Sequence, residues 1–502
     1  MVYDSYSLLK TGKDQTGASF PLTFQMGAGR PAGYVYFSIP FVAIFGPGAW
    51  GVRGLSVLSS LGIILMMFLL VKKLFGEKVG LISAFLVSVS PWDLSLARGG
   101  FESHFALFLA LSGLYFLLKV KKSGWNFILA VIFWGLTVNT YPTYKIVLPI
   151  LLPIIIWYVG GVKNFLPKNK LVIFLGSILA IGIIGITLSQ TFTAGSENRF
   201  LDLNLFSSSK EAVEQDINFN RSVDKSNSLI GKLFYNKPLS YFKLLGSSYL
   251  SDFSLEYLVV NGDKNPRHNM TSSGLIYVIE IVTIILGFGY FYNQKEKRRD
   301  FIFVLFWLLI APIGATFMLD NHGLRTNFML PPLIIFSALG IYRLMLTKRP
   351  ILIIGVITIW LIQFIFVLER LYFLSPNRFA RFWSNMAKTV ATQSFEQKDN
   401  YNYIIISSKI DNVEYAYQVY NKIDPNMVIK QNSQKTTLGN YEFKKYDNVY
   451  IGSVPEGALF AFLGSLKGKA KYYGSFNEAN LLGKYSTLLD LDNVPSAVIY
   501  EK

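Results

Sequence analysis

The chain has 502 residues, of which 52% are hydrophobic and only 16% are charged. These fractions exclude an ordinary soluble protein, in which about a quarter of the residues are charged, and favour a membrane protein. The absence of cysteine excludes a disulfide framework, a thiolate metal site and a cysteine nucleophile. The net charge of +17 would suit nucleic acid, but the charges are distributed as they are in membrane proteins.

The first 50 residues are predicted to lie outside the membrane. They are polar to about Gly33 and then apolar over 34–45, a stretch that Pro40 interrupts. These 12 residues are too few to cross a bilayer, so the stretch predicts an interfacial or re-entrant helix. Residues 1–13 lack the basic and apolar regions of a signal peptide. Some element must carry this segment across the membrane, and we expect a transmembrane helix upstream of Met1.

Ten apolar runs near the length of a membrane span follow, which predicts a polytopic α-helical membrane protein with a bundle over 51–369. One large polar outside loop, 190–272, interrupts the bundle and carries short helical patterns. The second run is the weakest candidate for a span because it is short. The runs are 51–71, 79–92, 103–118, 125–141, 145–160, 171–189, 273–292, 301–319, 327–346 and 350–368.

Basic residues fall in alternate short connections between these runs. One set of connections holds 15 lysines and arginines, whereas the connections between them hold three. This asymmetry is the positive-inside pattern, in which basic loops stay in the cytoplasm. It predicts a multi-pass protein of the cytoplasmic (inner) membrane, embedded in the lipid bilayer with both termini outside, and it argues against nucleic acid as a partner. The three outside cations are Arg98, Lys145 and Arg325.

From Ser375 onward the composition changes to that of a soluble protein. Strand patterns alternate with helix patterns, which predicts a small C-terminal α/β domain over 376–502. Because it follows the last span, this domain is expected on the outer face. The predicted strands are 401–407, 427–430 and 449–454, and the predicted helices are 412–422 and 456–467.

Ionisable residues gather at four outside ends of the predicted spans. Charges near membrane depth are costly unless they are paired or used, so a convergent set is a functional hypothesis. Guanidinium and imidazolium groups give charge-assisted hydrogen bonds to phosphate oxygens, which predicts a site for the phosphate or pyrophosphate of a lipid. The residues are Arg98 with Glu102, Tyr141 with Lys145, Asp263 with Arg267 and His268, and His322 with Arg325.

Several of these residues also have a purely structural interpretation. Lys145 or Arg325 taken alone can extend its charged end to the lipid headgroups. The Arg267-His268 pair can belong to a solvated turn after a proline. His104, one step inside an apolar run, is predicted to be a packed core histidine. No metal site is predicted, because the bundle shows no convincing acidic pair.

Five motifs occur in a fixed order along the chain. They are Tyr6-Ser-Leu-Leu-Lys-Thr-Gly-Lys-Asp-Gln-Thr-Gly17, Tyr34-Val-Tyr36 with Pro40, Ser90-Pro-Trp92 with Arg98 and Phe101-Glu102, Asn261-Gly-Asp-Lys-Asn-Pro-Arg-His268, and His322-Gly-Leu-Arg325 with Leu330-Pro-Pro332. In order and spacing they resemble bacterial membrane glycosyltransferases of the GT-C fold, which are relatives of protein O-mannosyltransferases and of the lipid A aminoarabinose transferase. The similarity runs along about 1–375.

The resemblance implies a polyprenyl-phosphate-sugar-dependent glycosyltransferase that moves a hexose or pentose. Such enzymes take the sugar from a polyprenyl phosphate on the outer face and pass it to a protein, lipid or glycan acceptor, and no cofactor is implied. The residues expected to hold the donor phosphate are Arg98, Lys145, Arg267, His268, His322 and Arg325, with Tyr141 and Asp263 beside them.

This chain also departs from the family pattern. Family members carry an Asp-Glu pair after a first transmembrane helix, a few residues before the first motif, and Met1 falls just past that place. The carboxylates left to take the proton from an acceptor hydroxyl are Asp4, Asp14 and Glu102. A rival hypothesis therefore stays open, namely a non-catalytic scaffold or a transporter of lipid-linked sugars. A transporter should show paired half-helices or matching halves, and the sequence shows neither.

Overall fold

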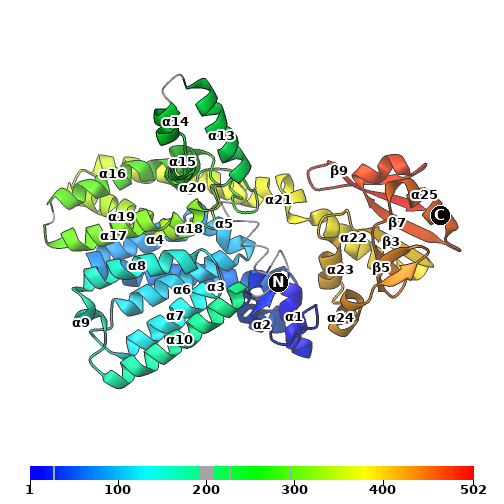
Figure 1. Cartoon of the computed structure of the whole chain (residues 1–502), viewed down its shortest axis with the longest axis horizontal. Helices are drawn as coiled ribbons and strands as arrows, with labels where there is room; N and C mark the ends of the chain where they lie inside the picture. The colour runs from blue at the N-terminus through cyan, green and yellow to red at the C-terminus, as the bar shows by residue number, and fades with distance from the viewer. Residues whose placement is uncertain (26–28, 193–208, 225–227, 294) are drawn as a thin grey trace. The chain divides into compact units, whose positions relative to one another are not determined.

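The computed structural model describes residues 1–25, 29–192, 209–224, 228–293 and 295–502. The chain forms two compact units (Figure 1). Unit 1 comprises Met1–Pro21, Val35–Leu55 and Glu369–Lys502, and unit 2 comprises Leu22–Tyr34 and Ser56–Leu368. Unit 2 is a helical bundle, and unit 1 contains a seven-stranded sheet with its covering helices.

The helices of unit 2 follow the predicted apolar runs. Five segments are long and apolar enough to cross a membrane, and a sixth candidate is the pair α4 and α5, which meet at 55°. The five segments are Ala49–Phe75 (α3), Lys170–Phe192 (α10), Arg298–Thr316, Asn327–Leu346 and Pro350–Arg378. The third segment consists of α17 (Arg298–Ile310) and α18 (Ile313–Thr316), the fourth of η3 (Asn327–Met329) and α19 (Leu330–Leu346), and the fifth begins with α20 (Pro350–Glu369). The bent pair is α4 (Glu77–Ser88) with α5 (Pro91–Gly99).

Four other predicted runs form shorter helices of 14 to 16 residues: α6 (Glu102–Leu117), α7 (Trp125–Val138), α8 (Tyr144–Val159) and α16 (Val278–Asn293). Length and composition therefore support five or six spans among the described residues, whereas about ten were predicted. The region between α10 and α16 contains the expected short helices, α13 (Lys210–Val223), α14 (Ser228–Phe234) and α15 (Lys237–Ser251), and α9 (Val162–Phe165) lies between α8 and α10.

The bend between α4 and α5 has a local cause. Pro91 is the first residue of α5, where its missing N–H needs no partner, and its ring disfavours helical backbone in the residue before it. Ser90 accordingly is extended, with φ −62° and ψ 131°. The helix restarts in a new direction and places Trp92 and Asp93 in the interior, both fully buried.

Helices α16 and α19 pack backbone against backbone. A Cβ on Gly287 would lie 2.0 Å from the carbonyl oxygen of Phe336, and a Cβ on Gly340 would lie 1.8 Å from that of Thr283. Small residues permit this approach, which gives membrane helices close van der Waals contact. The hydroxyls of Thr283 and Ser337 lie 2.7 Å apart across the same interface.

We expect Gly340→Ala to destabilise the bundle by roughly 1–3 kcal/mol, because the added methyl overlaps the Thr283 carbonyl unless the helices separate. Thermal unfolding of the purified protein in detergent measures the change. Gly355→Ala on α20 is the matched control, since a Cβ there meets nothing within 4 Å. Equal shifts of the two unfolding midpoints would contradict the tight packing of α16 and α19.

Unit 1 is organised around a mixed sheet. Its strands are β3 (Tyr403–Ser407), β4 (Thr436–Leu438), β5 (Tyr441–Tyr446), β6 (Val449–Gly452), β7 (Ala470–Ser475), β8 (Ser486–Leu489) and β9 (Pro495–Glu501), and its helices include α22 (Asn385–Glu396), α23 (Val413–Tyr420), α24 (Pro425–Ser433) and α25 (Glu456–Ser465). The strand order is β4-β5-β6-β3-β7-β9-β8, and β3 is parallel to both of its neighbours. Ile404 and Ile406 pack with α22 and α23 on one face, and Ile405 packs on the face that α25 covers (Figure 1).

The predicted α/β character of the C-terminal region is confirmed, and two of its three predicted strands and both predicted helices are present with shifted ends. The strand predicted at 427–430 is wrong, because these residues lie in α24. Asp424 caps this helix by accepting a hydrogen bond from the backbone N–H of Asn426, and Pro425 occupies its first position. Both features start helices and outweigh the strand preference of the short apolar run.

The N-terminal segment is helical where an interfacial helix was predicted. The helix α2 (Gly33–Phe45) contains Pro40, and α1 (Val2–Thr11) precedes it. Within unit 1, α1 packs on α23 and α24, where the buried Tyr3 hydroxyl donates to the carbonyl oxygen of Ile423 at 2.9 Å. The first helix is therefore part of the core of unit 1.

Candidate functional site

Asp263 is held in a tight loop that fixes its carboxylate locally. Gly262 has φ +67°, and a Cβ there would lie 2.4 Å from the carbonyl oxygen of Ser273, so glycine is required. Asp263 Oδ1 accepts from the backbone N–H of Asn265 at 2.8 Å. Asn269 closes the loop by donating to the Ser273 carbonyl oxygen at 2.9 Å.

A second segment, between α18 and α19, reaches the other oxygen of Asp263. Oδ2 accepts from the backbone N–H of Gly323 at 2.6 Å and from Nδ1 of His268 at 3.0 Å. The rings of His268 and His322 have centroids 4.4 Å apart, and His322 Nδ1 accepts from the backbone N–H of Leu324 at 3.3 Å. We name Asp263, His268 and His322 the Asp–His–His cluster, since each offers an atom within 4.8 Å of the others.

The bundle supports this cluster from a third side. Nε1 of Trp92, on α5, donates to the carbonyl oxygen of Gly323 at 2.9 Å. Phe101, between α5 and α6, presents its ring to His268 edge-on, with centroids 5.3 Å apart. The cluster geometry thus depends on how three segments pack, because none of them builds it alone.

Burial and neighbouring charges set the protonation states in the cluster. Burial alone would raise the pKa of Asp263, but the hydrogen bond from His268 and the nearby imidazole charges outweigh it and hold the pKa below the usual value. Burial, together with the charges of His268 and Arg325, lowers the pKa of His322 to about 3. At neutral pH the cluster therefore holds a carboxylate and a neutral His322, whose proton is on Nε2 because Nδ1 accepts.

One carboxylate and two imidazoles are also a donor set that suits a divalent transition metal. In this structure, however, Oδ2 of Asp263 already accepts two hydrogen bonds, and Nδ1 of His322 accepts one. A metal would have to replace the hydrogen bond between Asp263 and His268. The arrangement as it stands favours hydrogen bonding to a ligand through Nε2 of His268, which has no hydrogen-bond partner among the described residues.

Of the other predicted phosphate ligands, Arg325 acts electrostatically on the cluster, whereas Lys145 bonds to a different helix. Arg325 is half-buried and pairs with Asp320 at 2.5 Å, and its charge acts on His322. Arg98, in the last turn of α5, and Arg267 are half-buried. The hydrogen bond described for Lys145 is to the Thr191 hydroxyl on α10, at 3.0 Å, and Tyr141 is half-buried in the turn before α8.

Glu102 lies in the first turn of α6 and is 8% exposed. Its Oε1 accepts from Nη1 of Arg30 at 3.0 Å, which ties α6 to the segment before α2. Because Phe101 contacts His268, the backbone next to Glu102 borders the cluster. Glu102 is therefore the predicted catalytic carboxylate that lies in the same unit as the Asp–His–His cluster.

Asp4 and Asp14 belong to unit 1, and both are buried. Oδ1 of Asp14 accepts from the N–H and hydroxyl of Thr16 and from the N–H of Ala18, at 2.7 to 2.9 Å. Asp4 accepts two longer hydrogen bonds from Gln15, at 3.5 and 3.4 Å. Both carboxylates thus stabilise the turn after α1, and a catalytic role for either stays a prediction.

Sequence reasoning missed a buried Asp–His pair inside the bundle. Oδ1 of Asp93 lies 2.9 Å from Nε2 of His104, and neither side chain is exposed. Oδ2 of Asp93 accepts from Ser60 at 2.5 Å, and Nδ1 of His104 lies 3.1 Å from the hydroxyl of Ser56. The prediction that His104 is a buried core residue is confirmed, but its partner was missed. The available signal was an acidic residue at the start of an apolar helix.

Asp252, at the end of α15, was also missed. It is 1% exposed, and burial raises its pKa to about 7. Its Oδ1 accepts from the amide of Asn321 at 3.0 Å, whereas Oδ2 has no partner among the residues that the structure describes. Since Asn321 precedes His322, this carboxyl borders the loop of the cluster. A carboxyl group with a pKa near neutrality is suited to proton transfer.

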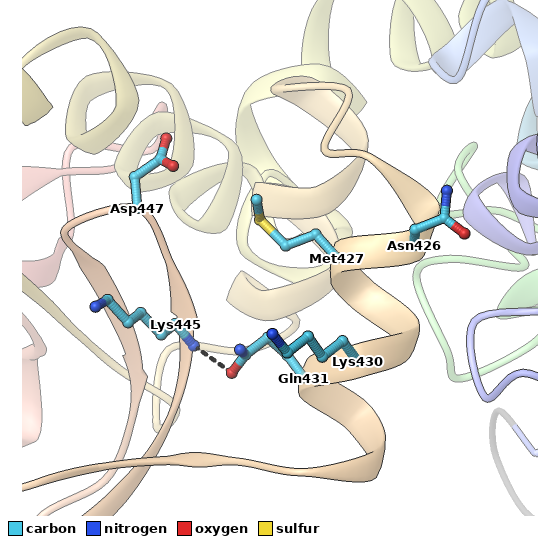
Figure 2. Close-up of a pocket in the computed structure, with 6 residues that line it drawn as sticks. All are labelled: Asn426, Met427, Lys430, Gln431, Lys445 and Asp447. Atoms are coloured by element: carbon cyan, nitrogen blue, oxygen red, sulfur yellow. Dashed lines mark hydrogen bonds between the residues drawn. The ribbon is translucent and has the colours of Figure 1, made fainter.

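A separate open hollow lies on the C-terminal part of unit 1. Figure 2 shows the backbone nitrogen of Lys445 directed toward α24, where Oε1 of Gln431 accepts from the Lys445 backbone N–H at 2.9 Å, whereas the Lys445 side chain extends away from this helix. The hollow offers amide and ammonium groups but no imidazole, so the Asp–His–His cluster remains the better candidate for chemistry. The lining residues are Asn426, Met427, Lys430, Gln431, Lys445 and Asp447.

Residues 30–186 match the family model described as dolichyl-phosphate-mannose-protein mannosyltransferase. The resemblance that the sequence motifs predicted is thus confirmed over this range, which contains Arg98, Glu102 and Lys145 but ends before the Asp–His–His cluster. A comparison with curated proteins gives no match.

Solved structures of two membrane proteins are similar to the chain. The oligosaccharyltransferase AglB from Archaeoglobus fulgidus, in complex with an inhibitory peptide and a dolichol-phosphate, is 15% identical with a TM-score of 0.46, over 83% of this chain and 58% of that one. The chain therefore spans little more than half the length of that protein. ArnT from Cupriavidus metallidurans is 12% identical over 100% of this chain and 92% of that one, with TM-scores of 0.44 in the apo state and 0.42 bound to undecaprenyl phosphate.

Proposed function

We propose, from the match of residues 30–186 to the mannosyltransferase family model, that this chain is a glycosyltransferase. It takes a sugar from a polyprenyl-phosphate donor and passes it to a protein, lipid or glycan acceptor on the outer face of the cytoplasmic membrane. The family match is the observation that carries this proposal. The geometry around the Asp–His–His cluster then suggests what individual residues do.

The donor phosphate binds beside the cluster. Asp263 orients His268 through Nδ1, so that Nε2 faces away from the carboxylate and donates to a phosphate oxygen when the imidazole is protonated. Arg267, next to His268 in the chain, and Arg325, whose charge acts on His322, supply positive charge, and Arg98 in the last turn of α5 is a third cation. His322 stays neutral and donates through Nε2. These groups stabilise the negative charge that grows on the phosphate as the bond between it and the sugar breaks.

The reaction also needs a proton acceptor. As the acceptor oxygen bonds to C1 of the sugar, the C1–O bond to phosphate breaks and the acceptor hydroxyl loses its proton to a carboxylate. Glu102 is one candidate in unit 2, where its Oε1 lies 3.0 Å from Nη1 of Arg30. Asp252 is the other, because its pKa of about 7 matches the proton transfer better.

The test removes one cation at a time from the site. We expect Arg267→Ala and Arg325→Ala each to lower kcat/KM for the donor by about 10- to 100-fold, the cost of one charged hydrogen bond. Transfer of radiolabelled sugar from a panel of polyprenyl-phosphate sugars, in membranes, gives the rates. Lys264→Ala is the matched control, since Lys264 is an exposed cation in the same loop.

Wild-type rates in all three variants would contradict the assignment of the phosphate site. Donor binding without transfer from any sugar in the panel would contradict the transferase and favour the rival, a scaffold or transporter of lipid-linked sugars.

A further inference from the structure

A cavity of 320 Å³ opens at the end of the helical bundle that carries the basic connections. Lys73 reaches it from the end of α3, Lys121 from the connection between α6 and α7, and Arg299 from the start of α17. We propose that this cavity, named the basic cavity, binds the phosphate of an anionic ligand, and that the ligand is a phospholipid headgroup. This inference is independent of the proposed function and of the Asp–His–His cluster.

The charges of the basic cavity are not balanced from within. Neither Lys73 nor Lys121 forms an ion pair with any residue that the structure describes. Asp300 also lines the cavity, but its carboxylate is already engaged by the Tyr158 hydroxyl at 2.6 Å and by Lys297 at 3.4 Å. Glu296, the other acid in the lining, is exposed to solvent. The cavity therefore offers an anion two ammonium groups that form no ion pair with the described residues.

Among the basic residues of the cavity, Arg299 has a side chain that contacts with Trp157 hold in place. Its Nη2 donates to the carbonyl oxygen of Trp157 at 2.5 Å, and its guanidinium lies 5.5 Å from the centre of the Trp157 ring. These contacts hold the planar group at the cavity while leaving its other N–H donors available. A guanidinium held in this way matches the paired oxygens of a phosphate, whereas the lysines act as point charges.

The position of the basic cavity favours a lipid as the source of the phosphate. Trp157 is 44% exposed near the end of α8, and an exposed tryptophan beside an apolar helix is typical of the membrane interface. Basic pockets between transmembrane helices on the cytoplasmic side bind phospholipid headgroups. The acyl chains would then lie along the exposed apolar surface of α8, which includes Ile146 and Ile150.

The alternative to a specific site is a general attraction of the basic surface to anionic lipid. Lysines next to the basic cavity provide a test that distinguishes these two explanations. Lys72 precedes Lys73, and Lys122 follows Lys121, but neither Lys72 nor Lys122 lines the cavity. Both are exposed. Lys72 pairs with Glu77 at 3.0 Å. Removing either pair of lysines deletes two positive charges from neighbouring positions, so general attraction of net charge predicts equal effects, whereas a site in the cavity does not.

The experiment measures phosphatidylglycerol binding to the purified full chain in a neutral detergent, by native mass spectrometry. We expect the double variant Lys73→Gln, Lys121→Gln to bind about 25-fold more weakly than the wild type, at about fivefold per lysine. The matched double variant Lys72→Gln, Lys122→Gln should stay within about twofold of the wild type on the same scale. Arg299→Lys retains the charge and should still weaken binding, because the planar group is lost.

Parallel titrations with phosphatidylcholine and with inorganic phosphate identify the source. Weak binding of both probes supports an anionic phospholipid, while tight, variant-sensitive binding of inorganic phosphate would overturn the lipid and leave a soluble phosphate as the ligand. Equal losses in the two double variants would overturn the basic cavity as a site. The unfolding midpoint of each variant shows whether it folds, and Arg299→Lys provides a second variant if the double variant does not.

Discussion

Replacing Asp263 by Asn should reduce sugar transfer by about 10²- to 10³-fold. Oδ2 of Asp263 accepts from both Gly323 and His268, and Oδ1 accepts from the N–H of Asn265, so the NH2 of an asparagine faces a donor in either orientation. If the NH2 takes the place of Oδ2, both Gly323 and His268 lose their acceptor; if it takes the place of Oδ1, the N–H of Asn265 loses its acceptor and the loop that orients the carboxylate moves. Radiolabelled transfer rates give the size of the loss, and NMR of the imidazole nitrogens reports the tautomer.

Asp216→Asn is the control for Asp263→Asn, because Asp216 is exposed on α13, in the same region between α10 and α16. It should transfer sugar at the wild-type rate. The ionised Asp263 contributes stability that is present above the unfolded pKa of about 4 and is lost as the pH falls through its lower folded pKa. If Asp263→Asn retained both the wild-type rate and the wild-type acid stability, the proposed orientation of His268 would be wrong.

Replacing His104 by Ala should destabilise the bundle by about 3–5 kcal/mol, since it empties a fully buried site and leaves Oδ1 of Asp93 buried without its hydrogen-bond partner. Ser60 alone would then satisfy the carboxylate. Thermal unfolding in detergent measures the loss. Ser112→Ala on the same helix is the control, because its hydroxyl bonds only to the carbonyl oxygen of Phe108 one turn away, and its effect should be small.

The double variant Asp93→Leu, His104→Leu distinguishes the contribution of the Asp93–His104 contact from that of the packing around it. Replacing both partners of a buried hydrogen bond by apolar residues costs less than removing one, so part of the stability should return. A double variant as unstable as His104→Ala would show that Asp93 and His104 are not coupled, and that packing around α5 and α6 causes the loss.

The sequence predicted part of the candidate site. The motifs predicted that Asp263, His268, His322 and Arg325 belong together, and the structure brings the first three within hydrogen-bonding range or ring contact. Lys145 was grouped with them because it also ends a predicted span, but its described hydrogen bond goes to α10. The ends of spans are visible in a sequence, whereas the side of the bundle on which each one lies is not.

The misassigned segment of the C-terminal region has a similar explanation. Residues 427–430 are three apolar residues followed by Lys430, a stretch too short to show a strand or helix period, so it fits a strand as well as a helix. The Asp424-Pro425 start signal was present in the sequence and decides for a helix. Asp252 was overlooked because nothing in its neighbours predicts burial of a carboxylate at the end of a loop helix.

The sequence by itself determined that this is a helical membrane protein with an α/β C-terminal region, and it located the apolar helices of the bundle. Hydrophobic length, charge asymmetry and strand–helix alternation are all properties of neighbouring residues, so they can be read along one dimension. Only the tertiary structure decided that Gly323 and His268 share one oxygen of Asp263, and that Asp93 faces His104. Such contacts join separate segments, and their distances follow from how the helices pack and bend.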